Sequence, residues 1–251
     1  MPTTRYPRLT DDDLGPMIAA LGADGVTQFD QVRDPDGTSS LIATIDGTQA
    51  AEPPPAQVDA AQMKALLKAA MDEQEVTDPS FRAGIAAIAG GESGFRPRSE
   101  VGCGHTDVAR IRALFGSRVA DLSDDGLRDL ATRDKDFFDT VYGGDWGRKR
   151  LGNNDDGDGY RFRGRGIFQL TGRDNYARYG QKIGFNLVTD PDSANAPETA
   201  AKIAVAYIMD RFHGGDFAAM KRAVGNSVGP PDAEKNSLYQ AYLQSGEFAA
   251  A

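Results

Sequence analysis

Apolar residues recur every three to four positions along most of the chain beyond residue 58, which is the spacing of helices that bury one face. The first such stretch carries Met63, Leu66, Leu67, Ala70 and Met71. The second opens with Asp78 and Pro79, a capping residue followed by the residue favoured at the first helical position. It continues with the same spacing through Phe81, Ile85, Ile88, Ala89 and Glu92. Both patterns predict helices.

Further helices are predicted where the same period follows a capping residue. Thr106 precedes an apolar face that includes Val108 and Ile111, and Ser123 precedes Leu127 and Leu130. The period also predicts helices over residues 134–142, 173–182, 197–212, 216–224 and 232–243. Strand signals are weak here, so the sequence predicts a mainly α-helical domain with a small N-terminal appendage.

The N-terminal residues follow a different pattern. Thr10 followed by an acidic run indicates a short helix, and the turn-forming segment Asp34-Pro-Asp-Gly37 separates two apolar stretches that fit a strand pair. The consecutive prolines after residue 52 indicate a stiff, extended linker. We therefore expect three parts: a small segment or domain of unknown role over 1–50, a proline-rich linker over 51–57, and a catalytic domain over 58–251.

Composition and charge exclude several classes of protein. The 251-residue chain is 40% hydrophobic and 26% charged, with a net charge of −9, which argues against binding to nucleic acid or to anionic membranes. No stretch approaches the about 18 apolar residues that a membrane span requires, and the N-terminus lacks the apolar core of a secretory signal. The single cysteine, Cys103, excludes an intramolecular disulfide. We expect a monomer without a cofactor or membrane insertion.

The segment Gly159–Tyr176 carries the strongest chemical signal. It reads GYRFRGRGIFQLTGRDNY and combines glycines and arginines with Gln169, Thr171 and Asn175. Glycine allows a ligand to approach the backbone closely, while amide and hydroxyl side chains supply the directional hydrogen bonds that sugars require. Just before it, Asn154, Asp156 and Asp158 have the spacing of the first ligands of a calcium loop. Arg165 occupies the position where that loop requires a bidentate glutamate, so the pattern is incomplete as a metal site.

Two carboxylates precede this segment. Glu92 continues the apolar face of its predicted helix, and desolvation there favours the protonated form that a general acid needs. Glu100 follows eight residues later, beyond a loop through Pro97 that can turn the chain back. Two carboxylates separated by roughly 6.5–9.5 Å can hydrolyse a glycosidic bond with inversion. Asp107 is the alternative second carboxylate.

The segment Gly164–Tyr176 resembles the signature of the family 19 glycoside hydrolases, the chitinases and chitinase-like phage endolysins, which reads approximately G-R-G-x-x-Q-L-T-x-x-x-N-Y. Glu92-Ser-Gly-Phe95 is similar to the catalytic-acid segment of that family, and Val141–Gly144 with Leu151–Asn153 is similar to its cleft-lining stretch. The resemblance covers about residues 60 to 245. It implies a lysozyme-like or chitinase-like helical fold and a glycosidase activity.

The resemblance also implies roles for individual residues. Glu92 would be the general acid, Glu100 the general base, and Thr171 the residue that helps to hold the attacking water. The implied contacts with the sugar chain come from Gln169, Asn175, Tyr176, Arg165, Trp146 and Asn226. Tyr176 and Trp146 fit a core position as well as they fit a sugar-stacking position.

The function expected from the resemblance is an endolysin-type enzyme that cleaves peptidoglycan strands between N-acetylated amino sugars. Three alternatives stay open: a chitinase, a lytic transglycosylase that uses one glutamate, and a virion or wall-binding protein with degenerate catalysis. Because no secretory signal is visible, we expect synthesis in the cytoplasm and action on the bacterial wall after release by a holin, a virion or a secretion system.

Overall fold

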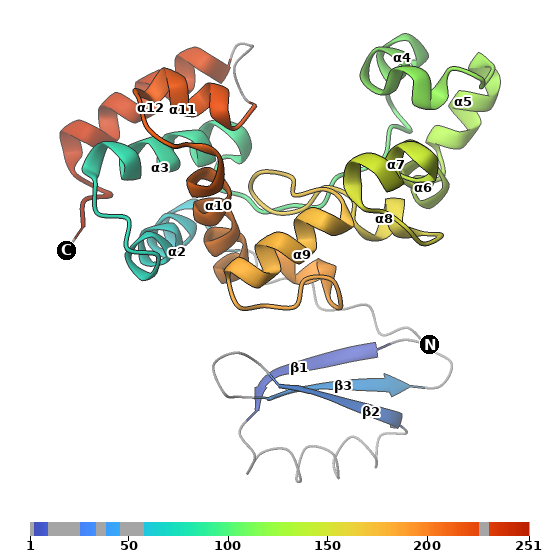
Figure 1. Ribbon diagram of the computed structural model, residues 1–251, viewed down its shortest axis with the longest axis horizontal. Helices are drawn as coiled ribbons and strands as arrows, with labels where there is room; N and C mark the ends of the chain where they lie inside the picture. The colour runs from blue at the N-terminus through green and yellow to red at the C-terminus, as the bar shows by residue number, and fades with distance from the viewer. Residues whose placement is uncertain (1–2, 10–25, 34–38, 46–57, 226–230, 251) are drawn as a thin grey trace. The chain divides into compact units, whose positions relative to one another are not determined.

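The computed structural model describes residues 3–9, 26–33, 39–45, 58–225 and 231–250. It divides into two compact units, residues 1–57 and 58–251 (Figure 1). The helix expected after Thr10, the turn Asp34–Gly37, the proline-rich linker and Asn226 lie outside the described residues.

The first unit contains a three-stranded antiparallel sheet. Its strands are β1 (Thr3–Leu9), β2 (Val26–Arg33) and β3 (Ser39–Ile45), and β3 lies between the other two. The register places Phe29 opposite Ala43. The pairing of β2 with β3 agrees with the strand pair predicted from the two apolar stretches, whereas β1 was not predicted.

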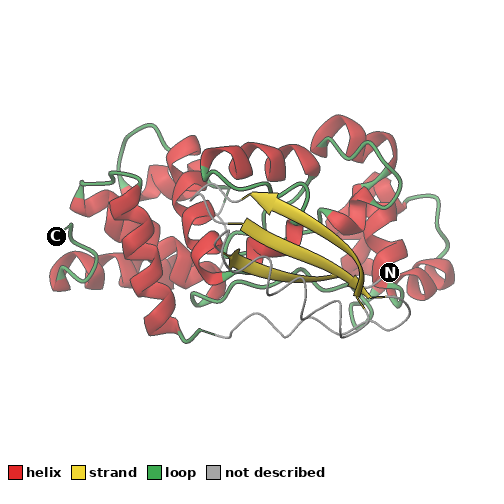
Figure 2. Cartoon of the chain, turned by 90° about the horizontal axis from the view of Figure 1, so that it is seen from below, coloured by secondary structure: helices red, strands yellow, loops and turns green. Residues whose placement is uncertain are grey.

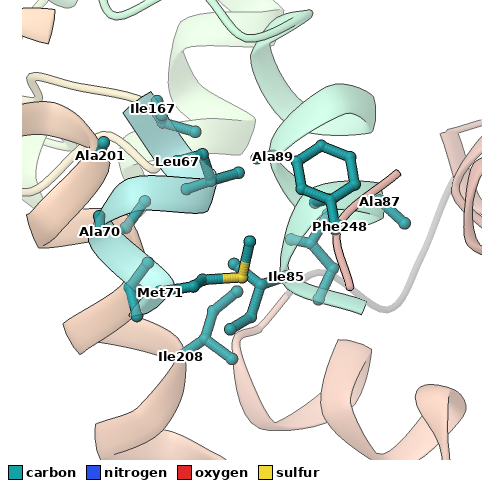
Figure 3. Close-up of a cluster of buried hydrophobic side chains, with 14 of the residues drawn as sticks. Leu67, Ala70, Met71, Ile85, Ala87, Ala89, Ile167, Ala201, Ile208 and Phe248 are labelled. Carbon is teal, nitrogen blue, oxygen red and sulfur yellow. The ribbon is translucent and has the colours of Figure 1, made fainter. Parts of the chain in front are cut away.

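The second unit is built on helices, which are drawn in red in Figure 2. Its largest core lies among α2 (Ala60–Glu73), α3 (Pro79–Ser93), α10 (Pro197–Arg211), α11 (Phe217–Ala223) and α12 (Pro231–Ser245). Leu67 and Met71 of α2 meet Ile85 of α3 and Ile208 of α10 in this core (Figure 3). Because α3 is buried almost all round, its C-terminal end is held firmly, and that end carries Glu92.

A second core lies among the shorter helices of the middle of the chain. It comprises buried residues of α4 (Val108–Phe115), the 3-10 turn η1 (Gly116–Val119), α5 (Asp124–Ala131) and α6 (Asp134–Tyr142). Next along the chain come α7 (Gly144–Leu151) and α8 (Asp158–Arg161), and α8 packs against α6. This group carries Tyr142 at the end of α6 and Trp146 on α7.

A third core connects the glycine-rich segment to the first group of helices. It contains Phe162 and Leu170 of that segment, residues of α9 (Arg173–Lys182) and η2 (Pro191–Asn195), and Ile203 and Ala206 of α10. The segment is therefore attached to the helical scaffold on its apolar side.

Helix ends follow the predicted capping chemistry at most positions. The side chains of Asp78 and Ser123 accept hydrogen bonds from the third residue of their helices, as expected. The cap of α4 is Asp107 and not Thr106, because the Asp107 carboxylate accepts from the Arg110 N–H. The second unit is mainly helical, so the predicted fold class is confirmed. Among the described residues, no helix is both long enough and apolar enough to cross a bilayer.

Candidate active site

Glu92 lies on the last turn of α3 beside a lysine from the far end of the chain. Its side chain is 28% exposed, and its Oε1 forms an ion pair with Nζ of Lys235 on α12. The Lys235 side chain is only 4% exposed, because its methylene stem passes over Gly91. A methyl group on Gly91 would lie 2.4 Å from Lys235 Cγ. The sequence predicted that Glu92 is desolvated at the end of an apolar helix face. This prediction is only partly confirmed, because the Glu92 carboxylate contacts both solvent and the Lys235 ammonium group.

Glycines around a catalytic carboxylate can leave room for a substrate, but two of those around Glu92 make room for side chains of the protein itself. Gly90 makes room for the buried ring of Phe95, whose atoms would lie 2.9 Å from an added methyl group, and Gly91 makes room for Lys235. Gly94 ends the helix in the left-handed conformation, with φ of 59°. The chain therefore turns sharply just after Glu92 and is held by Phe95.

Glu100 lies in a more enclosed position, where two hydrogen bonds fix both of its carboxylate oxygens. The Tyr142 hydroxyl at the end of α6 donates to Oε1 at 2.9 Å, and the Gly164 N–H donates to Oε2 at 3.1 Å. An added methyl group on Gly164 would lie 3.0 Å from Glu100 Oε2 and 2.9 Å from Gln169 Oε1. Glycine at 164 thus allows the carboxylate of Glu100 and the amide of Gln169 to converge on one point.

Burial raises the pKa of Glu100, and this effect exceeds the opposing effects of Tyr142, the Gly164 N–H, Arg163 and Arg118. Burial and the adjacent Glu100 charge raise the pKa of the Tyr142 phenol as well. The phenol therefore stays protonated and remains a donor. A carboxylate with a raised pKa is a stronger base than an ordinary one, which suits proton abstraction from a water.

The glycine-rich segment forms a tight turn that lies along the Glu100 loop. Arg165 and Leu170 exchange backbone hydrogen bonds of 3.2 and 2.8 Å across this turn. On the other side, the Glu100 N–H donates to the Gly164 carbonyl at 2.7 Å and the Arg98 N–H to the Gly166 carbonyl at 3.5 Å. These backbone contacts place the predicted signature against the predicted base.

Gln169, Thr171 and Asn175 form a short chain of hydrogen bonds. Gln169 Nε2 donates to the Arg98 carbonyl at 2.9 Å, the Thr171 hydroxyl to the Gln169 carbonyl at 2.9 Å, and Asn175 Nδ2 to the Thr171 carbonyl at 2.7 Å. Gln169 and Thr171, two residues apart, would share one face of an extended stretch, but this stretch is not extended. Gln169 has φ of 52°, in the left-handed region, because it closes the turn.

Arg165 and Tyr176 lie in the interior. Tyr176 is fully buried, and Arg165 is 2% exposed and forms an ion pair with Asp192 at 2.7 Å. Arg165 Nη1 also donates to the Tyr176 hydroxyl at 3.0 Å, while that hydroxyl donates to the Arg163 carbonyl at 2.7 Å. In this arrangement both side chains support the turn from behind and have no surface to offer a sugar chain.

Trp146 lies on α7 with 37% of its surface exposed. The guanidinium carbon of Arg118 lies 4.2 Å from the centroid of the Trp146 ring. Arg118 donates to the carbonyls of Leu114, Phe115 and Val141, so one guanidinium closes the C-terminal ends of α4 and α6. Trp146 therefore belongs to the border of the middle group of helices, on the same side as Tyr142.

Two carboxylates in and next to the loop before α8 bind an arginine of the same chain. Asp158 is buried and accepts from Arg173 Nε at 2.8 Å and Nη2 at 2.6 Å, and also from the Asp155 N–H at 3.0 Å. This bidentate pair engages a carboxylate that a calcium loop would need. Within the described part of the chain, no three acidic, histidine or cysteine side chains are grouped to hold a metal ion.

Three residues of the site were not identified as site residues from the sequence. Lys235 lies 143 positions from Glu92, in a segment recognised only as a helix. Arg118 and Arg163 are two of many arginines, and only the fold places them near Glu100. The segment that contains Tyr142 did carry a signal, through its resemblance to a cleft-lining stretch.

Glu92 is thus within reach of solvent, and Glu100 is held by hydrogen bonds beside the glycine-rich turn. A pair of carboxylates is what most glycoside hydrolases use. No family model matches the chain. Over 60 residues, or 23% of the chain, it is 43% identical to a glycosyl hydrolase family 19 domain-containing protein of Haemophilus influenzae. The match spans 30% of the length of that protein. It supports a relationship to the family 19 glycoside hydrolases at the level of the family.

Proposed function

We propose that this protein is an endolysin-type peptidoglycan hydrolase, which cleaves the glycan strand between N-acetylated amino sugars with inversion. The observation that carries this proposal is the setting of Glu100. Its two oxygens are fixed by Tyr142 and Gly164, burial raises its pKa, and the amide of Gln169 lies beside it. This is the environment of a general base that activates a water.

Glu92 acts as the general acid in this mechanism. The ion pair with Lys235 contains Glu92 in its ionised form, so Glu92 first takes up a proton from solvent, which its partial exposure permits. Lys235 Nζ can still donate to the protonated carboxyl and so limits the directions in which it points. Protonation of the leaving oxygen by Glu92 and removal of a proton from water by Glu100 occur on opposite faces of the sugar. The anomeric configuration is therefore inverted.

The turn beside Glu100 positions the water and the sugar. The Thr171 hydroxyl donates to the Gln169 carbonyl, so its oxygen keeps lone pairs with which to accept from a water. Gln169 Oε1 and the Asn175 carboxamide oxygen are acceptors for N-acetyl and hydroxyl groups. Because the substrate is a wall polymer, the enzyme acts on the bacterial cell wall after its release from the cytoplasm by a holin, a virion or a secretion system. It works as a monomer.

The Glu100→Gln variant tests this mechanism against a transglycosylase, in which the substrate's own hydroxyl attacks and no base is needed. We expect turnover on solubilised peptidoglycan strands to fall by about 10²–10⁴-fold, because the amide cannot take the proton of the water. Wild-type products analysed by mass spectrometry should carry ordinary reducing ends. A parallel assay on chitin oligomers measures the preference between the two polymers.

The matched control is Asp107→Asn, because asparagine can cap α4 as aspartate does. It should leave activity unchanged. Full activity of Glu100→Gln with anhydro-muramic ends would identify a transglycosylase. Full activity of Glu100→Gln with ordinary ends, together with an inactive Asp107→Asn, would move the base to Asp107.

A further inference from the structure

Arg163 has an unusual position among the arginines of the glycine-rich segment. It immediately precedes Gly164, whose N–H holds Glu100. Its guanidinium carbon lies 4.1 Å from the centre of the Tyr160 ring, and Nη1 donates to the Tyr160 carbonyl at 3.0 Å. The side chain is half-buried. One face of the guanidinium is thus fixed on an aromatic ring, and the group has little freedom left to lose on binding a ligand.

The neighbouring arginines have their donors engaged in other ways. Arg165 and Arg173 form ion pairs with aspartates, and Arg161 donates to the carbonyls of Val188 and Thr189. No carboxylate of the described residues lies within ion-pair distance of Arg163. Its charge is nevertheless felt at Glu100, whose pKa it lowers. A positive charge that lowers the pKa of Glu100 makes it a weaker base for the proposed reaction. We therefore expect Arg163 to have another function that offsets this loss.

A guanidinium fork fits a carboxylate, with two parallel hydrogen bonds and complementary charge. Chitin is uncharged, whereas every second sugar of a peptidoglycan strand carries a stem peptide with free carboxylates. We propose that Arg163 binds a stem-peptide carboxylate of the strand and so makes the site selective for peptidoglycan. This inference rests on the proposed function and names the group of the substrate that determines its specificity.

The test compares one glycan in two charge states. Peptidoglycan strands are N-acetylated on their amines, and half of the sample is then treated with carbodiimide and methylamine, which converts carboxylates to neutral methylamides. The ratio kcat/KM is measured on both samples for the wild type, Arg163→Gln and Arg163→Lys. Arg161→Gln is the control for loss of a nearby exposed positive charge. Each variant is assayed on the plateau of its own pH profile, so that a change in Glu100 ionisation does not enter the comparison.

We expect the wild type to lose about tenfold in kcat/KM on the neutral strands, the effect of one charge-assisted hydrogen-bonded pair. Arg163→Gln should lose the same factor on the untreated strands and nothing further on the neutral ones, as in a double-mutant cycle with a direct contact. Arg163→Lys should keep part of the preference, and Arg161→Gln all of it.

Two results would overturn the inference while leaving the proposed function intact. In one, Arg163→Gln loses the same factor on both samples, which would assign Arg163 to the fold or to the tuning of Glu100. In the other, Arg163→Gln has the same kcat/KM as the wild type on untreated strands. A wild-type protein that cleaves neither sample, yet melts cooperatively, would refute the proposed function and this inference with it.

Discussion

Glu92 and Glu100 are eight residues apart in the sequence and have contrasting surroundings. Glu92 is partly open to solvent at the end of a rigid helix, with a buried lysine as its partner. Glu100 is in a loop, yet its two oxygens are held by a phenol and a backbone N–H, and burial raises its pKa. The rigid element carries the less constrained carboxylate, and the loop carries the more constrained one.

This difference shows how a loop can be made as precise as a helix. The Glu100 loop gains its order from hydrogen bonds to the Gly164 turn and to α6, and the same contacts lower the pKa of the carboxylate against the larger effect of burial. The order of Glu92 comes from α3, which leaves its environment free to admit a substrate. A proton donor must reach the substrate, while a base must be aimed at one water.

The variant with the largest expected effect is Glu92→Gln. The amide keeps the shape of the side chain and can still accept from Lys235, so the protein should fold, but it has no proton to transfer. We expect turnover on peptidoglycan strands to fall by about 10²–10⁴-fold, while the variant still melts cooperatively. The exposed neighbour of Lys235, Glu234, provides the control as Glu234→Gln. More than a tenth of wild-type turnover in Glu92→Gln would refute the acid assignment.

Lys235→Met tests whether the ion pair orients Glu92. Methionine keeps the apolar stem that passes over Gly91 and removes the charge. We expect kcat to fall by roughly tenfold to a hundredfold with little change in KM, because a carboxylate without its partner samples unproductive directions. Lys235→Arg should restore part of the loss. Lys202→Met, which removes a surface ion pair with Glu73, should have no effect, and an equal loss there would make the Lys235 effect nonspecific.

The sequence correctly predicted those helices whose buried residues recur with the helical period of three to four residues. The helices over 134–142 and 173–182 have the bounds that were predicted, because the residues that they bury, such as Phe137 and Val141 or Tyr176 and Tyr179, recur with the helical period. It did not predict α7, whose only buried residue is Gly147. That helix has no apolar period and depends on contacts such as Arg118 with Trp146, which are not local.

The candidate site divides in the same way. Gln169, Thr171 and Asn175 lie close together in sequence and in space, so a local motif was enough to find them. Lys235 and Arg118 reach the site through packing between elements that are distant in sequence. No local pattern of residues in the sequence predicts such packing. The interior position of Arg165 was equally impossible to predict, since a motif residue can support a turn from behind as well as face a ligand. For Tyr176, a core position was one of the two alternatives that the sequence left open, and it is the one observed.

The smallest expected effect belongs to Tyr142→Phe, which distinguishes the two carboxylates by pH. The Tyr142 hydroxyl donates to the ionised form of Glu100 and so lowers its pKa against the larger effect of burial. Loss of that donor should raise the pKa further, so that a higher pH is needed to ionise the base. The acid limb of the kcat/KM profile should therefore move upward by about one pH unit, while the plateau changes little. Tyr239→Phe on α12 is the control and should leave the limb in place. An acid limb that stays in place in Tyr142→Phe, or moves downward, would mean that the ionisation of Glu100 does not govern it.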